Sequence, residues 1–155
     1  MPIEKQSKGT NGPDSNRKSE IGNRQFVDVS AAIILRNNKL LITQRHANSH
    51  LGGLWEFPGG KREPDETFEQ CLVRELHEEL GVKTKVGPLF EEITHAYADK
   101  TVRLKFFLCE LSNGEPQPLG CAAVKWVGKS ELADYDFPAA DARLLEKLGR
   151  LESKL

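Results

Sequence analysis

The stretch GGKREPDETFEQCLVRELHEELGV, residues 59–82, places two glycines and a polar segment before a run with helical periodicity. Asp65 is a suitable N-cap and Gly81 a suitable C-terminal stop, so the pattern predicts a helix from Asp65 to about Leu80. At about 100° per residue, its carboxylates and its apolar side chains fall on adjoining arcs. The acidic arc holds Glu75, Glu78 and Glu79, and the apolar arc holds Leu72, Val73, Leu76 and Leu80. One side of the helix is therefore expected to pack and the adjoining side to gather carboxylates.

Three carboxylates on one arc have two explanations, a solvated acidic face or a cation site. For three glutamates alone, the solvated face is the commoner explanation. Like charges one turn apart destabilise a helix by a few tenths of a kcal/mol, and a hard cation such as Mg²⁺, which prefers oxygen ligands, removes that cost. Arg74 lies one turn before Glu78 and can pair with it, while the Gly59-Gly60 turn lets a backbone carbonyl approach. These neighbours favour a metal site.

The sequence around this helix predicts an α/β fold with a mixed sheet covered on both sides. Strand patterns and turn signals alternate before and after the helix. An amphipathic helix is expected at residues 139–151, with Leu144, Leu145 and Leu148 on one face. The expected strands are residues 26–35, 39–44, 54–57, 82–94, 101–111 and 124–127.

Composition and charge exclude several classes of protein. Hydrophobic residues make up 38% and charged residues 29% of the 155-residue chain, which is a globular balance. The formal net charge of -1 predicts no non-specific electrostatic binding to a nucleic-acid polymer or an anionic membrane. Residues 1–22 have few large apolar side chains and are expected to be a flexible tail, with one domain at 23–155.

The cysteines and the N-terminus indicate a cytoplasmic protein. Cys71, Cys109 and Cys121 are odd in number and have no CxxC spacing, so we expect reduced thiols. A nucleophilic cysteine is the less favoured alternative. The N-terminal residues have no apolar segment of the kind found in secretory signals, and no apolar run is long enough to span a membrane.

The pattern Gly60-x5-Glu66-x7-Arg74-Glu75-Leu76-x-Glu78-Glu79-x-Gly81-Val82 matches the Nudix box at every specified position. Similarity extends to Gln44-Arg45, to Gly53-Leu54-Trp55-Glu56-Phe57-Pro58-Gly59-Gly60-Lys61 and to Phe137-Pro138-Ala139-Ala140. Over residues 26–148 the chain therefore resembles the MutT-type branch of the Nudix hydrolases. The resemblance implies an α/β/α sandwich in which the box forms a loop–helix–loop.

The resemblance also implies an activity and a set of site residues. Family members of this type hydrolyse nucleoside triphosphates to the monophosphate and pyrophosphate with Mg²⁺, for which Mn²⁺ can substitute, and sanitise nucleotide pools in support of DNA repair. Carried over, the metal ligands are Glu75, Glu78, Glu79 and the Gly59 carbonyl, and the residues expected to act in catalysis are Glu78, Glu75 and Arg74, with Glu78 the first choice of base. Gly60, Glu66 and Gly81 are expected to hold the box in shape.

One departure from the family pattern concerns an auxiliary acid. Members of this branch often carry another glutamate in the loop before the strand that ends in Trp-Val. Here that loop reads Gly120-Cys121-Ala122-Ala123-Val124-Lys125, without an acid. A metal ligand or base from this loop is therefore in doubt, and more of the metal binding falls to the helix.

The resemblance places the reader of the base at Asp141, after the Phe-Pro-x-Ala element. An ionised carboxylate only accepts hydrogen bonds, so it suits an exocyclic amine or a guanine N1–H edge, and the hypothesis is a preference for CTP or modified dCTP over 8-oxo-dGTP. The plainer alternative is an acid in the first turn of the last helix. Other candidates for substrate binding are Arg45, Phe57, Gly60, Lys61 and Phe137, although solvated or core positions explain Arg45 and the two phenylalanines equally well.

Two rival functions share the same residues. The C-terminal domain of adenine DNA glycosylases resembles this chain in residues 54–61 and 94–97 and recognises oxidised guanine without hydrolysing it. A Nudix hydrolase for ADP-ribose or a dinucleoside polyphosphate would need the same box. His77 and His95 have no partner at metal-ligand spacing, so we expect structural or solvent-facing roles for them.

Overall fold

The computed structural model describes residues 25–150, and the tail predicted at 1–22 lies outside them. The strands form a seven-stranded mixed sheet with the path β3-β2-β1-β6-β5, to which β4 adds through β1 and β7 through β2. Strands β1 and β6 run parallel, while the other pairs are antiparallel. The bounds are β1 Gln25–Arg36, β2 Lys39–Gln44, β3 Trp55–Glu56, β4 Gly59–Lys61, α1 Phe68–Leu80, β5 Lys83–Ala96, β6 Lys100–Asn113, β7 Ala123–Gly128 and α2 Ala142–Arg150.

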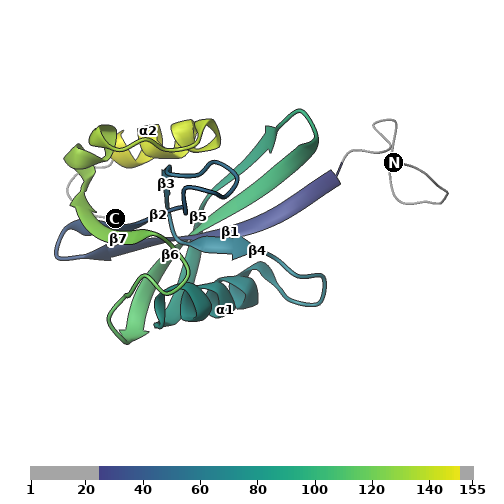
Figure 1. The fold of residues 1–155 in the computed structure, drawn as a ribbon. Coiled ribbons are helices and arrows are strands. Elements are labelled where there is room, and N and C mark those ends of the chain that lie inside the picture. The colour runs from purple at the N-terminus through teal and green to yellow at the C-terminus, as the bar shows by residue number, and fades with distance from the viewer. Residues whose placement is uncertain (1–24, 151–155) are drawn as a thin grey trace.

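The two helices cover opposite faces of the sheet, so the expected α/β/α sandwich is confirmed (Figure 1). Strand β1 contributes to both apolar clusters because successive side chains point to opposite faces. Ala31 and Ile33 pack in the cluster that includes α2, and Ala32 and Ile34 pack in the cluster that includes α1. This central strand therefore anchors both helices to one frame.

Helix α1 ends where the sequence predicts but begins two residues later. Gly81 has φ 72 and closes the helix in the left-handed conformation that glycine adopts without strain. The N-cap is Thr67, not Asp65, so the predicted cap is wrong. Thr67 Oγ1 accepts from Gln70 N at 3.0 Å, and Gln70 Oε1 accepts from Thr67 N at 2.9 Å. This capping box satisfies two backbone amides that Asp65 would leave unpaired.

Replacing Thr67 by Ala is expected to destabilise the fold by about 1 kcal/mol, because the amide of Gln70 at the start of α1 loses its acceptor. Urea denaturation followed by circular dichroism measures this change. Thr67→Ser keeps the hydroxyl and should retain most of the stability. Equal unfolding midpoints for Thr67→Ala and the wild type would show that the capping box contributes nothing.

Two further segments differ from the expectation. The sequence predicts a turn at Pro58-Gly59-Gly60, but Gly59–Lys61 is the strand β4, whose register pairs Ser30 with Gly60. It also predicts that the last helix begins at Ala139, but Ala139–Asp141 forms a turn of 3-10 helix before α2. Both differences change where the candidate site residues lie. The three cysteines are free, as the sequence predicts, and all three are buried.

Candidate active site

Strand β4 makes room for the carboxylates of α1. A Cβ atom at Gly60 would coincide with the carboxyl group of Glu75, and one at Gly59 would meet the backbone oxygen of Ser30. Only glycine leaves the space that this approach of helix and strand requires. Gly59 and Gly60 therefore allow the carboxyl group of Glu75 to lie against β4.

Glu79 is the most deeply placed carboxylate of α1. Its Oε1 atom is buried without a hydrogen-bond partner, a condition that is costly for a charged group. Burial, then the charges of Glu56 and Glu75, raise the pKa of Glu79 to about 8, although Arg45 and a hydrogen bond from the Gly59 amide oppose this rise. A buried oxygen that lacks a partner is the kind of group that a cation satisfies.

Arg74 organises the box around its guanidinium group. Its Nη2 and Nε donate to the two oxygens of Glu66 at 2.7 and 3.1 Å, and Nη2 also donates to the Lys61 carbonyl at 3.1 Å. Its Nη1 donates to Glu75 at 3.0 Å and to Glu78 at 3.3 Å. The Arg74 hydrogen bonds lower the pKa of Glu66 to about 2. Arg74 and Glu66 therefore fix the loop to the helix, in agreement with the role expected for Glu66.

The donor chemistry of this helix fits a hard divalent cation. Glu75, Glu78 and Glu79 offer oxygen atoms, and Glu78 has 59% of its side chain exposed, so it can reach a ligand at the surface. Within residues 25–150, no three acidic, histidine or cysteine side chains already form a metal-ligand cluster. Arg74 donates to Glu75 and Glu78, whereas Glu79 Oε1 is buried. A cation that binds here would compete with the Arg74 ion pairs.

The loop that lacks the auxiliary acid caps the end of α1 instead. The amides of Leu119 and Gly120 both donate to the Glu79 carbonyl at 3.0 Å, and the amide of Gln117 donates to the Leu80 carbonyl at 3.0 Å. A Cβ at Gly120 would lie 3.2 Å from Glu79 Cγ. These amides satisfy carbonyls that a helix end leaves unpaired. The loop therefore packs tightly behind Glu79 and supplies no carboxylate at its tip.

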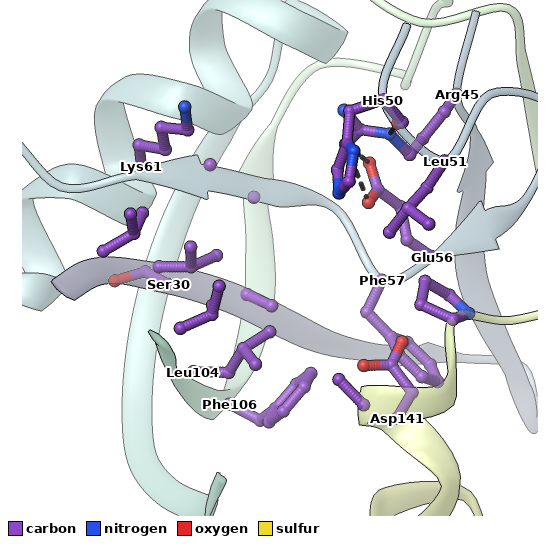
Figure 2. Close-up of a pocket in the computed structure, with 18 of the residues that line it drawn as sticks. Ser30, Arg45, His50, Leu51, Glu56, Phe57, Lys61, Leu104, Phe106 and Asp141 are labelled. Carbon is purple, nitrogen blue, oxygen red and sulfur yellow. Dashed lines mark hydrogen bonds and ion pairs between the residues drawn. The ribbon is translucent and has the colours of Figure 1, made fainter. Parts of the chain in front are cut away.

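A cavity of about 160 Å³ opens beside β4, between the box and α2 (Figure 2). Its apolar floor comes from alternate residues of β1 and β6, which face the same side of the sheet because the strands are parallel and in register. Its polar groups come from the loops and strand ends around it. The floor residues are Val27, Val29, Ala31, Val102, Leu104 and Phe106.

Two carboxyl groups point into this cavity, the half-buried Glu56 from β3 and the buried Asp141 from the turn before α2 (Figure 2). Asp141 is 4% exposed. Burial, followed by the charge of Glu56, raises the pKa of Asp141 to about 7. Burial also raises the pKa of Glu56, although Arg45 donates to it at 3.2 Å and opposes the rise. The cavity therefore presents two carboxyl groups whose pKa values are both raised by burial.

The other substrate-binding candidates divide into two groups. Arg45, Phe57, Gly60 and Lys61 line the cavity, and their role in substrate binding stays a prediction. Phe137 is not among the lining residues, and its ring packs on Phe57 with centroids 5.4 Å apart. The structure therefore favours the core alternative for Phe137.

The sequence reasoning missed four residues that line the cavity. Glu56 lies within a predicted strand, where a charged residue usually indicates a solvent-exposed sheet edge, so the sequence did not single it out. His50, Tyr97 and Lys100 lie in loops or at strand ends, where spacing carries no signal. The ring of Tyr97 contacts His50 at 6.0 Å and His95 at 4.7 Å between centroids. His95 therefore has a structural contact and His77 is exposed, as expected for both.

Comparison with known proteins identifies the class of this site. The profile described as NUDIX domain matches residues 30–147, so the chain belongs to the Nudix family of hydrolases, which generally depend on divalent metal ions. None of the helices in residues 25–150 has both the length and the apolar character needed to cross a membrane.

Particular relatives narrow this class to the MutT-type branch. The chain is 40% identical over 115 residues to the 8-oxo-dGTP diphosphatase of Escherichia coli, an alignment that covers 74% of this chain and 89% of the relative. It is 39% identical over 122 residues to the CTP pyrophosphohydrolase of the same organism, covering 79% and 90%. The solution structure of the E. coli ORF135 protein matches with a TM-score of 0.70 and 38% identity, covering 83% and 91%.

Without metal, the stability of this protein is expected to fall as pH rises from about 4.5 to about 8. In that window the unfolded chain has released the proton of Glu79 while the folded chain retains it, so the folded state binds more protons and loses stability as pH rises. Asp141, with a pKa of about 7, acts in the same direction. Glu66, with its pKa lowered to about 2, contributes a constant stabilisation above about pH 4.5.

Urea denaturation near both ends of this window, with and without saturating Mg²⁺, measures the effect. Added Mg²⁺ is expected to restore stability mainly at the upper end, where the carboxylates are ionised, because binding to the folded state stabilises it. A metal-free protein whose stability rises across the window would contradict the burial of Glu79.

Proposed function

We propose that this protein hydrolyses a nucleoside or deoxynucleoside triphosphate to the monophosphate and pyrophosphate, with Mg²⁺ as the natural cation and Mn²⁺ as a substitute. The observation that carries this proposal is the buried oxygen of Glu79, which has no hydrogen-bond partner among residues 25–150, on a carboxyl group that is hydrogen-bonded to the backbone of Gly59 at the edge of a cavity with an apolar floor. The Glu79 oxygen can hold a cation close to the phosphates, and the cavity can hold a base. The diphosphatase and pyrophosphohydrolase relatives support the same reaction. A hydrolase that acts on free nucleotides would sanitise the nucleotide pool and in this way support DNA repair. We propose that the protein acts in the cytoplasm.

Each residue of the box has a separate part in the proposed reaction. When bound, Mg²⁺ would neutralise phosphate charge and make the attacking water more acidic. Glu75, Glu79 and the Gly59 carbonyl would hold the cation together with Glu78. Glu78 is also the most exposed of the three carboxylates, so it is our choice for the group that accepts the proton of the water attacking phosphorus. Arg74 would orient Glu75 and Glu78 through its Nη1 atom.

The two carboxyl groups of the cavity favour a base with an exocyclic amine. With its pKa raised to about 7, Asp141 is present in both its protonated and its ionised form near neutral pH, so it can donate or accept a hydrogen bond. The edge of cytosine offers an amine donor and a ring-nitrogen acceptor. In this proposal Lys61 would bind the phosphates, and Arg45, which donates to Glu56, would lie near the base. We therefore propose CTP or modified dCTP as the preferred substrate, rather than 8-oxo-dGTP.

A panel of Mg²⁺-dependent hydrolysis assays tests the substrate. Values of kcat/KM for CTP, dCTP, 5-substituted dCTP and 8-oxo-dGTP should rank the cytosine compounds first. A clear advantage for 8-oxo-dGTP would contradict the base preference but not the reaction. Turnover of ADP-ribose or a dinucleoside polyphosphate alone would contradict the triphosphate proposal, and ligand binding without any turnover would favour a recognition module.

Asp141→Asn is expected to lower kcat/KM for CTP by about tenfold and to reduce the preference for CTP over GTP. The amide cannot cycle between donor and acceptor as the carboxyl group does. The effect should appear mainly in KM, because the box is unchanged. Asp134→Asn, at an exposed position, is the matched control and should behave as the wild type. An unchanged ratio of kcat/KM for CTP and GTP in Asp141→Asn would remove Asp141 from base recognition.

A further inference from the structure

Glu91 of β5 joins the sheet to the last helix through both of its carboxyl oxygens. Lys147 donates to Oε1 at 3.0 Å and Arg143 donates to Oε2 at 3.1 Å. The Glu91 side chain is 15% exposed, whereas those of Arg143 and Lys147 are 65% and 39% exposed. These hydrogen bonds lower the pKa of Glu91, so the carboxylate is charged at neutral pH. The charged and mostly buried Glu91 carboxylate therefore holds the cationic side chains of Arg143 and Lys147 at one point of β5.

The same two cations also bind the backbone of β5. Lys147 Nζ donates to the Phe90 carbonyl at 2.6 Å and lies 4.4 Å from the centre of the Phe90 ring. Arg143 Nη2 donates to the Glu92 carbonyl at 3.0 Å. Four hydrogen bonds therefore connect one side of α2 to three consecutive residues of a single strand. We call Glu91, Arg143 and Lys147 the α2 clamp.

Irregular pairing of β5 places the α2 clamp next to the cavity. The register between β5 and β6 shifts between Val86 and Leu89 and again between Leu89 and Glu91. After the second shift Glu91 lies opposite Phe106, which forms part of the cavity floor. Bulges of this kind change where side chains point and are common next to functional sites. Through this register shift, the α2 clamp lies next to the part of the cavity floor that faces Asp141.

The clamp holds the helix that follows Asp141 directly. Arg143 is two residues after Asp141, within the first turn of α2, and the turn Ala139–Asp141 contacts β5. The helix has only nine residues, and the buried apolar residues at and before it are Ala140, Leu144 and Leu148. Apolar packing of this kind is non-directional, whereas the hydrogen bonds from Arg143 to Glu91 and to the Glu92 carbonyl tie the first turn of α2 to one point of β5. The depth of Asp141 in the cavity is therefore expected to depend on this ion pair as well as on the apolar packing.

We propose that Glu91 is a positioning residue for base selection, which sets the depth of Asp141 in the cavity by clamping the first turn of α2. This inference rests on the proposed hydrolysis of a nucleoside triphosphate. It assigns Glu91 no contact with the substrate and no part in the metal site. The base preference of this enzyme then depends on an ion-pair cluster outside the cavity.

Glu91→Gln tests the proposal in the full chain. The expected result is a fall of about tenfold in the ratio of kcat/KM for CTP over GTP, carried by KM for CTP, since a charge-assisted hydrogen bond contributes about that factor. The saturating kcat for CTP and the Mg²⁺ concentration for half activation should stay within about twofold. Glu115→Gln removes a surface ion pair to Arg36 and is the matched control, expected to leave the ratio unchanged.

A second measurement reports on the carboxyl group of Asp141 directly. Carbon-detected NMR of carboxyl groups as a function of pH reports the titration of Asp141, which should move in Glu91→Gln and stay fixed in Glu115→Gln. A lower melting temperature in Glu91→Gln with an unchanged CTP preference and an unchanged Asp141 titration would overturn the proposal, because Glu91 would then act on stability alone. If Glu91→Gln does not fold, Arg143→Gln removes one arm of the clamp and is judged by the same measurements.

The outcomes separate this inference from the reaction on which it rests. A wild-type protein that hydrolyses no nucleoside triphosphate contradicts the proposed function, whereas the Asp141 titration still tests the clamp. A wild-type protein that prefers CTP, together with a Glu91→Gln variant that keeps that preference, contradicts the clamp alone.

Discussion

Glu79→Gln is expected to lower kcat/KM for the nucleotide substrate by roughly 10³-fold, which corresponds to about 4 kcal/mol of transition-state stabilisation. The amide removes a charge from the proposed metal site at its deepest point. Glu79 Oε1 has no hydrogen-bond partner, so the protein offers this oxygen no substitute for a cation. Steady-state assays of pyrophosphate release over a range of Mg²⁺ concentrations measure the loss.

The same substitution is expected to stabilise the metal-free protein at neutral pH. Burial raises the pKa of Glu79 to about 8, so keeping this group in the fold is unfavourable whenever it is ionised. Glu69→Gln, an exposed position in the first turn of α1, is the matched control and should keep full activity. Loss of activity together with loss of stability in Glu79→Gln would indicate a structural role instead of a ligand role.

Gly60→Ala is expected to lower kcat/KM by about 10²-fold, because a Cβ at this position coincides with the carboxyl group of Glu75. Glu75 must then rotate away from β4, or β4 must move away from β1. Either change displaces a proposed metal ligand, so the Mg²⁺ concentration for half activation should rise. The variant is assayed for kcat, KM and Mg²⁺ activation alongside the wild type.

Gly149→Ala is the matched control for this substitution. A Cβ at Gly149 meets no atom of residues 25–150 within 4 Å, and alanine favours a helix over glycine, so this variant should be fully active and at least as stable as the wild type. Wild-type Mg²⁺ activation in Gly60→Ala would contradict the fit between β4 and Glu75.

Much of the fold follows from local patterns in the sequence. The periodicity of residues 68–80 and the glycine at 81 predict the end of α1, because both act within one helix. The start was misplaced at Asp65, although the spacing of Thr67 and Gln70 fits a capping box and could have identified it. Strand β4 could not be predicted, since its three residues become a strand only by pairing with β1.

The candidate site was only partly predictable for the same reason. Glu75, Glu78 and Glu79 share an arc of one helix, so their grouping is a local property. Glu56 joins Asp141 only because the sheet brings β3 and the turn before α2 to one cavity, and no spacing in the sequence encodes that approach. Phe137 was a plausible base contact by similarity, but packing against Phe57 occupies its ring.

We expect this Nudix protein to cleave a nucleoside triphosphate between its α- and β-phosphates with the help of a divalent cation. Phosphorus NMR of CTP incubated with the wild-type protein and Mg²⁺ tests this cleavage, with a chelator-treated sample and Glu79→Gln measured beside it. The wild type with Mg²⁺ should give CMP and pyrophosphate, and both other samples should keep CTP intact. Release of CDP and inorganic phosphate, or equal turnover after chelation, would contradict this expectation.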